Sequence, residues 1–182
     1  QRLPVGLVIG AENTGSAVIL EQLQIDPRFK VASDTHFFSD LKKYKRGSRF
    51  YRTLMPSACK LDITLDCTSS YLEDEEVISR VRQFNRSIRL LVVLRDPIDR
   101  ALDDFKQIKG GGGAADFEKL VVGANGTINT ALDFISRSSY EVALSLWLKA
   151  FPLSQWQFID ANAFMTDPVS ELNAVASFFG LQ

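Results

Sequence analysis

Histidine and cysteine are scarce in this chain of 182 residues, which has one histidine, His36, and two cysteines, Cys59 and Cys67. A zinc site built from Cys and His, or a disulfide framework, needs more of these residues. No run of about eighteen apolar residues occurs, so the sequence predicts no membrane-spanning helix. The first residues lead directly into an apolar run, so we expect any targeting segment to lie outside these residues.

An excess of charge of either sign is also missing. The chain has 21 Lys and Arg against 22 Asp and Glu, and its net charge is −1. A protein that coats nucleic acid needs a basic surface, so we expect no nucleic-acid partner. Hydrophobic residues make up 46% and charged residues 24%, which is ordinary for a globular protein. The length predicts a single domain over residues 1–182 with a buried core.

Short apolar runs alternate with helix-length segments along the chain. Such alternation predicts an α/β fold, a three-layer arrangement in which helices flank both faces of a parallel sheet. In these folds ligands bind at the carboxyl ends of the strands, so the residues after each strand are the first candidates for a site. Strands are predicted over residues 5–10, 30–32, 61–66, 88–94 and 157–160, and helices over 18–25, 50–55, 73–84, 97–108, 129–150 and 168–179.

The loop after the first predicted strand has the frame of a phosphate-binding loop. From Gly10 it contains a glycine, four further residues, a second glycine and a hydroxyl residue, Ser16. Free N–H groups at the start of a helix can bind an anion there. A nucleoside triphosphatase needs Lys followed by Ser or Thr after the second glycine, and this loop has Ser16 and Ala17, which argues against that class. Taken alone, the loop fits equally well a tight turn in which Ser16 caps the helix.

Three further segments, read in order with this loop, resemble one family. They are residues 33–38 (SDTHFF), 47–56 (GSRFYRTLMP) and 94–105 (LRDPIDRALDDF), and residues 138–140, 147–152 and 167–181 continue the likeness. Together they are similar to the heparan sulfate glucosaminyl N- and 3-O-sulfotransferases over nearly the whole chain. The resemblance implies a sulfotransferase fold of the P-loop nucleotide-kinase type.

The resemblance also implies the reaction. The family transfers a sulfuryl group from 3′-phosphoadenosine-5′-phosphosulfate to a glucosamine nitrogen or oxygen of a heparan-type glycan. The product is 3′-phosphoadenosine-5′-phosphate, and no metal ion is needed. By resemblance, Arg95 binds the 3′-phosphate, and Asp103 stands where the family has a serine for the same group. The 5′-phosphosulfate lies on the loop residues Asn13, Thr14, Gly15 and Ser16.

The resemblance assigns the general base to Asp34, at a position where the family has a glutamate. Three further positions depart from the family pattern. Asn13 and Cys67 replace two lysines around the donor, and Asp103 would repel a phosphate at close range. Loss of positioned cations slows such reactions. The alternative function is therefore a catalytically impaired module with the sulfotransferase fold, which binds glycan or nucleotide without turnover.

A basic cluster lies between the predicted second and third strands. A solvated helix face and a binding surface for a sulfated glycosaminoglycan explain such a cluster equally well, and both stay open. As glycan-binding candidates, its members are Lys42, Lys43, Lys45, Arg46, Arg49 and Arg52.

His36 and Cys67 each have a functional and a structural interpretation. For His36 we favour a packed residue in a His-Phe-Phe turn over a catalytic base, because geometry rather than residue type makes a base. For Cys67 we favour a small buried apolar residue over a reactive thiol.

Two sequons, at Asn85 and Asn125, give mild support for a glycoprotein of the secretory pathway. The resemblance implies residence in the Golgi lumen, with a membrane anchor outside these residues. Family catalytic domains continue past the equivalent of Leu181, so we expect this chain to lack the family's C-terminal segment.

Overall fold

The computed structural model describes residues 1–109, 113–123 and 125–181. These residues form one five-stranded sheet in the order β2-β3-β1-β4-β5, and every pair of neighbouring strands is parallel. The predicted parallel sheet is thus confirmed. Its strands are β1 (Gly6–Gly10), β2 (Phe29–Ser33), β3 (Ile63–Cys67), β4 (Arg89–Leu94) and β5 (Trp156–Asp160).

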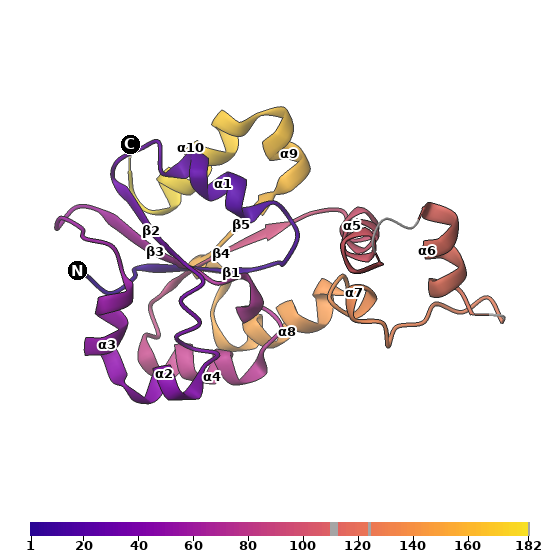
Figure 1. The fold of residues 1–182 in the computed structure, drawn as a ribbon. Helices are drawn as coiled ribbons and strands as arrows, with labels where there is room; N and C mark the ends of the chain where they lie inside the picture. Colours follow the sequence, from indigo (N-terminus) through magenta and orange to yellow (C-terminus); the bar gives the residue numbers. More distant parts are fainter. Residues whose placement is uncertain (110–112, 124, 182) are drawn as a thin grey trace.

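Helices cover both faces of the sheet, which confirms the three-layer prediction. Figure 1 shows α1 (Ser16–Leu23), α9 (Ala161–Thr166) and α10 (Pro168–Phe178) above the sheet. Below it lie α2 (Leu41–Lys45), α3 (Gly47–Leu54), α4 (Glu75–Phe84) and α8 (Tyr140–Ala150). Beyond the carboxyl ends of the strands lie α5 (Pro97–Lys109), α6 (Ala114–Val121) and α7 (Asp133–Ser136). Two short 3₁₀ helices are η1 (Ser69–Tyr71) and η2 (Leu153–Gln155).

The central strand β1 supplies side chains to both apolar layers. Leu7 and Ile9 pack with Trp147 on one face, and Val8 packs with Leu20 on the other. Alternating residues of one strand are buried on opposite faces because both faces are covered by helices. The position of the core therefore follows from the apolar run that the sequence shows.

Strand β3 carries polar side chains into the core. Its alternation of apolar and polar residues is typical of a half-buried strand, but Thr64 and Asp66 are both fully buried. The reason is that β3 is an inner strand, between β2 and β1, and helices cover both faces of the sheet. Thr64 meets its hydrogen-bonding need through the Leu3 carbonyl, at 2.9 Å, and Asp66 through a group of hydroxyls described below.

The predicted helix over residues 129–150 is wrong, because it is two helices, α7 and α8. Ser138 and Ser139 lie at the break, and their hydroxyls donate to the carbonyls of Phe134 and Ile135 at 2.8 and 3.3 Å. Such side-chain bonds compete with the helical pattern. Val18 of α1 is exposed, and so is Ile25, which lies beyond the end of α1. Helices α2, α6 and α9 were not predicted.

The start of α5 and the end of α10 lie where Pro and Gly residues in the sequence indicate helix ends. Asp96 accepts a hydrogen bond from the Ile98 N–H at 2.8 Å at the start of α5, next to Pro97. Gly180 follows α10 with φ of 79°, a conformation that favours glycine at a helix end. The predicted break over Gly110–Gly113 falls mostly on residues 110–112, which lie outside the described residues. Within the described part of the chain, no helix is long and apolar enough to cross a membrane.

Candidate active site

The loop after β1 leads into α1 through Gly15. Gly15 has φ of 85° and is the N-cap of α1, and Ser16 is its first residue. The interpretation in which Ser16 caps the helix is therefore wrong. Because Gly15 has no side chain, the first N–H groups of α1 remain available to an anion.

The two loop residues before Gly15 point in opposite directions. Thr14 is buried, and its hydroxyl donates to the Ala11 carbonyl at 2.8 Å, so it stabilises the loop from inside. Asn13 is exposed, and its amide donates to Asp104 Oδ1 at 2.8 Å. Of the two, only Asn13 is exposed to solvent.

Ser16 and Asp34 line the same cavity, of about 340 Å³, at the carboxyl ends of β1, β2 and β3. Cys67 also lines it. Asp34 is exposed with φ of 51°, and its N–H donates to the Cys67 carbonyl at 2.7 Å. The fold thus brings together the loop and the predicted base from segments far apart in the sequence.

Sequence reasoning missed a buried carboxylate beneath this cavity, Asp66. It accepts hydrogen bonds from the hydroxyls of Tyr51 at 2.6 Å, Thr35 at 2.7 Å and Thr68 at 2.9 Å. Burial raises the pKa of Asp66, and the hydroxyls oppose that shift. Since Thr35 follows Asp34 directly, this network positions the segment that carries the base. A polar residue at the end of a predicted strand was the available signal.

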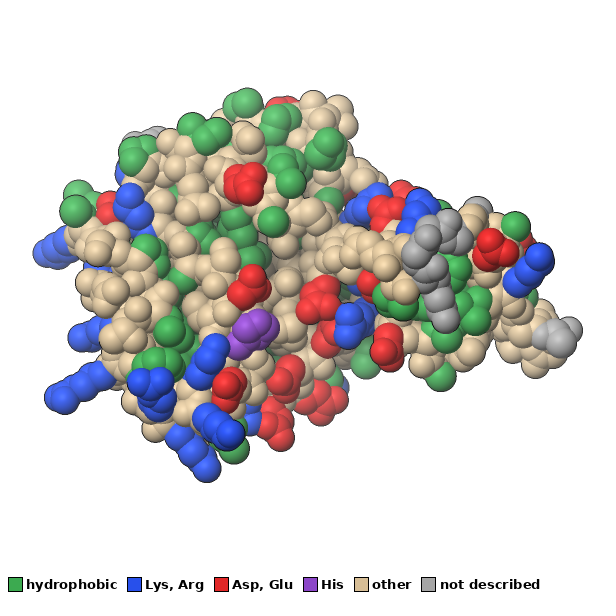
Figure 2. All heavy atoms as spheres, in the orientation of Figure 1, with side chains coloured by type: hydrophobic (Ala, Val, Ile, Leu, Met, Phe, Trp, Pro, Cys, Tyr) green, Lys and Arg blue, Asp and Glu red, His purple; other side chains and the backbone are tan. Residues whose placement is uncertain are grey.

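Cys67 is buried, as its structural interpretation predicts, whereas His36 is not packed as its structural interpretation predicts. Cys67 is 8% exposed, and burial, with nearby Asp66 and Asp34, raises its pKa to about 12, so the thiol stays protonated. His36 was expected to be packed, but it is exposed, with Nδ1 3.4 Å from the Ser39 hydroxyl. The turn buries Phe37 and Phe38 instead, which leaves the imidazole outside. Figure 2 shows the histidine with acidic side chains around it.

Arg95 follows β4 and lines a second cavity, of about 350 Å³, together with Asp160 at the end of β5. Its Nη1 donates to Asp103 Oδ2 at 2.7 Å, so the two predicted 3′-phosphate positions are in direct contact. Lys106 Nζ donates to the other oxygen of Asp103 at 3.1 Å. Lys106 was not among the candidates, although a spacing of three residues in a helix predicts such a contact.

Arg100 is a fully buried cation that sequence reasoning also missed. It donates to the Glu12 carbonyl at 3.2 Å, to the Phe134 carbonyl at 2.8 Å and to the Ser138 hydroxyl at 3.0 Å. Its Nη1 lies 3.6 Å from Asp104 Oδ2, a buried oxygen with no hydrogen bond in the described structure. Arg100 therefore connects the loop after β1 to α5 and α7.

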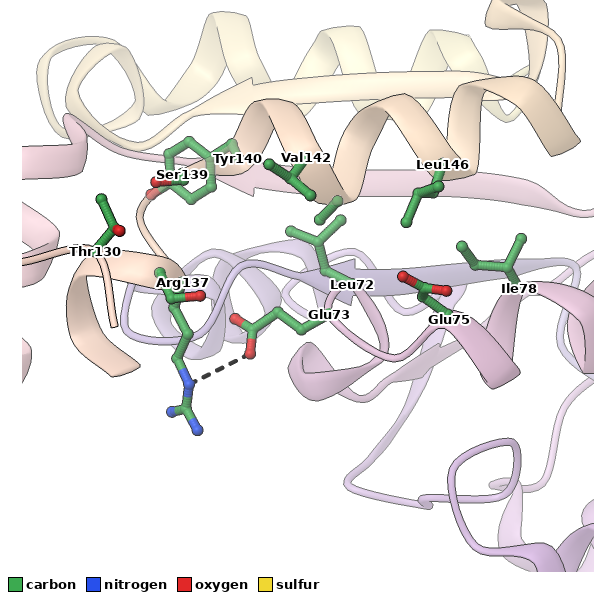
Figure 3. Close-up of a pocket in the computed structure, with 12 residues that line it drawn as sticks. Leu72, Glu73, Glu75, Ile78, Thr130, Arg137, Ser139, Tyr140, Val142 and Leu146 are labelled. Carbon is green, nitrogen blue, oxygen red and sulfur yellow. Dashed lines mark ion pairs between the residues drawn. The ribbon is translucent and has the colours of Figure 1, made fainter. Parts of the chain in front are cut away.

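A third cavity, of about 410 Å³, lies between α4 and α8 and is drawn in Figure 3. Apolar side chains such as Leu72 and Leu146 form its wall. At its mouth Arg137 pairs with Glu73 at 3.3 Å, and it also pairs with Glu12 of the loop after β1 at 2.9 Å. Burial raises the pKa of Glu73, and Arg137 opposes that shift.

Cations near the carboxyl ends of the strands therefore contact carboxylates, as Arg95, Arg100 and Arg137 all do. The basic cluster differs: within the described residues, none of its six cations pairs with a carboxylate, and five of the six are exposed. Lys and Arg gather over α2 and α3 at the lower left of Figure 2.

The basic cluster is not part of the cavities that contain Ser16 and Arg95. It is connected to them through Lys43, whose Nζ donates to the Thr35 carbonyl at 2.7 Å, one residue from Asp34. The described residues contain no group of three or more His, Cys, Asp or Glu side chains placed to hold a metal ion.

Comparisons with known proteins show which sequences and folds this chain is similar to. No family model matches the chain. The whole chain is 34% identical to mouse heparan sulfate glucosamine 3-O-sulfotransferase 5 and 32% identical to human heparan sulfate glucosamine 3-O-sulfotransferase 6, and covers 54% of each. It is 33% identical to mouse heparan sulfate glucosamine 3-O-sulfotransferase 3B1 and covers 47% of it. The chain thus spans about half the length of the curated relatives it matches.

Solved structures show the same fold over the whole chain. A sulfotransferase from Alicyclobacillus acidocaldarius superposes with a TM-score of 0.79 at 17% identity, and the match covers 83% of that chain. The mouse sulfotransferase SULT7A1, complexed with PAP, superposes with a TM-score of 0.63 at 16% identity over 60% of its chain. The chain therefore has the sulfotransferase fold and is homologous over its whole length to the heparan sulfate glucosamine 3-O-sulfotransferases.

Proposed function

We propose that this domain transfers a sulfuryl group from 3′-phosphoadenosine-5′-phosphosulfate to a glucosamine of a heparan-type glycan. The observation that carries this proposal is the cavity lined by both Ser16 and Asp34. It has an anion-binding loop on one side and a carboxylate on the other, which sulfuryl transfer requires. The names of the relatives favour the 3-oxygen of glucosamine over the nitrogen as the acceptor.

The residues have separate roles in this proposal. N–H groups at Gly15 and Ser16 hold the 5′-phosphosulfate, which supplies the activated sulfuryl group. Arg95 holds the second phosphate of the nucleotide, because its planar fork matches that group. Asp34 accepts the proton from the acceptor hydroxyl. The open loop and the arginine-lined cavity fit this donor, whereas Asp103 beside Arg95 fits it poorly.

Transfer of labelled sulfate tests the proposal. The protein is incubated with radiolabelled donor and heparan sulfate, beside a related enzyme under identical conditions, and we expect labelled glycan. Calorimetry with 3′-phosphoadenosine-5′-phosphate is the second measurement. Nucleotide binding without transfer would contradict the enzyme and leave the catalytically impaired binding module as the function.

We infer that α2 and α3 bind the anionic glycan. Their unpaired cations are free to contact sulfate and carboxylate groups, and the Lys43 contact connects them to the segment of Asp34. Replacing both Arg49 and Arg52 with glutamine is expected to lower the salt concentration at which the protein elutes from immobilised heparin. The salt dependence of binding to a polyanion reflects the number of cations engaged. The slope of log affinity against log salt concentration should therefore become shallower by about two.

A matched control removes two exposed cations from other helices, Lys119 of α6 and Lys149 of α8. The Lys119→Gln/Lys149→Gln protein has the same net charge as the Arg49→Gln/Arg52→Gln protein. Equal losses of heparin affinity in both would contradict a specific surface on α2 and α3.

We also propose that the protein is glycosylated at Asn125 in the secretory pathway. Asn125 is exposed, and the Thr127 hydroxyl of the same sequon donates to its Oδ1 at 2.7 Å. Asn85 is half-buried at the end of α4. After expression in secreting cells, Asn125→Gln is expected to remove the mass shift produced by a glycosidase, and Asn85→Gln to leave it. The reverse pattern would assign the glycan to Asn85.

A further inference from the structure

The carboxyl ends of β4 and β5 border the cavity of about 350 Å³ described above, and Arg95 is the one cation among the described residues that line it. Strands β1 and β4 are neighbours, so the loop after β1 and Arg95 leave the same edge of the sheet. Under the proposed function, a nucleotide with phosphates at two positions reaches both. The phosphate that meets Arg95 is the 3′-phosphate.

Asp103 already forms an ion pair with Arg95. One carboxylate oxygen accepts from Arg95 at 2.7 Å, and the other accepts from Lys106 at 3.1 Å. Hydrogen bonds from Arg95, and then from Lys106, lower the pKa of Asp103, so the carboxylate is charged at neutral pH. The side chains of Arg95 and Asp103 are 29% and 36% exposed, so a ligand can reach both.

A phosphate that approaches Arg95 must therefore displace a carboxylate or lie beside it. Like charges a few ångströms apart repel even where solvent is partly present. Lys106, which would otherwise add a second cation, is bound to the same carboxylate. Asp103 therefore competes with the 3′-phosphate for Arg95 and Lys106.

We propose that Asp103 determines nucleotide specificity: it lowers the affinity for a 3′-phosphate by competing for Arg95 and Lys106. This inference rests on the proposed function, because it assumes that a nucleotide binds at this edge of the sheet. It follows that 3′-phosphorylated and unphosphorylated adenosine nucleotides bind the natural protein with similar affinity.

Calorimetry at constant ionic strength tests the proposal with two probes, 3′-phosphoadenosine-5′-phosphate and adenosine 5′-phosphate. Asp103→Ser is expected to increase the affinity for the first about tenfold and to change that for the second less than about twofold. The control is Asp26→Ser, which removes an exposed Asp–Arg pair, with Arg28, outside the cavity. This control should change neither affinity.

Three outcomes would overturn the inference. Equal gains for both probes would mean that Asp103 acts only through overall charge. Unchanged affinity for the 3′-phosphorylated probe would mean that Asp103 does not compete for Arg95. If neither probe binds to either protein, the nucleotide site of the proposed function fails, and the inference fails with it.

Discussion

Replacing Asp34 with asparagine is expected to lower the rate of sulfuryl transfer by about 10²- to 10⁴-fold, the usual contribution of a positioned general base. Asparagine keeps the shape of the side chain but cannot accept the acceptor's proton. It also tolerates the positive φ of 51° at this position better than most residues. The measurement is the initial rate with labelled donor at saturating glycan.

The affinity for 3′-phosphoadenosine-5′-phosphate is the control, and it should be unchanged in the Asp34→Asn protein. A second variant, Asp34→Glu, keeps a carboxylate and lengthens the side chain by one methylene. We expect it to retain most of the activity. Transfer by the Asp34→Asn protein at the natural rate would show that another group takes the proton, and exposed His36 would then be the next residue to replace.

Replacing Arg100 with methionine is expected to lower the free energy of unfolding by about 3–5 kcal/mol, the cost of breaking a buried ion pair by removing one partner. Arg100 is fully buried, and its removal leaves Asp104 charged, buried and without a counterion. It also leaves the carbonyls of Glu12 and Phe134 without their donor. Chemical denaturation monitored by tryptophan fluorescence measures the change.

The double variant Arg100→Met/Asp104→Leu separates the effect of the buried charge on stability from the effect of packing. Replacing both partners with apolar residues of similar size avoids the uncompensated charge, so this protein should regain more than half of the lost stability. A loss below about 1 kcal/mol for Arg100→Met alone would contradict the role assigned to this cation.

Much of the layered architecture was predictable from local patterns. The apolar runs that became β1 and β4 are buried on both faces, and such runs are typical of parallel strands inside a sheet. The caps of α5 and α10 were visible because Asp, Pro and Gly act through their own backbone preferences. Helices α2 and α9 are only five and six residues long, which is too short to show a helical period.

The candidate site was less predictable. The loop after β1 and Asp34 could be named because the resemblance assigns them, and the fold brings them to one cavity. The buried partners could not be named in the same way. Asp66 accepts hydrogen bonds from the hydroxyls of Tyr51 and Thr35, two residues from different parts of the chain. Only the packing of the strands makes them neighbours.

By itself, the sequence determined the α/β class, the five strands in their order along the chain and the absence of the expected lysines at Asn13 and Cys67, since these depend on residues close together in the chain. The tertiary structure alone decided which charges around the site are paired. It paired Arg95 with Asp103 and Arg137 with Glu12 and left the cations of α2 and α3 unpaired in the described residues. The reason is that an ion pair depends on the distance between charges in space, and folding sets that distance.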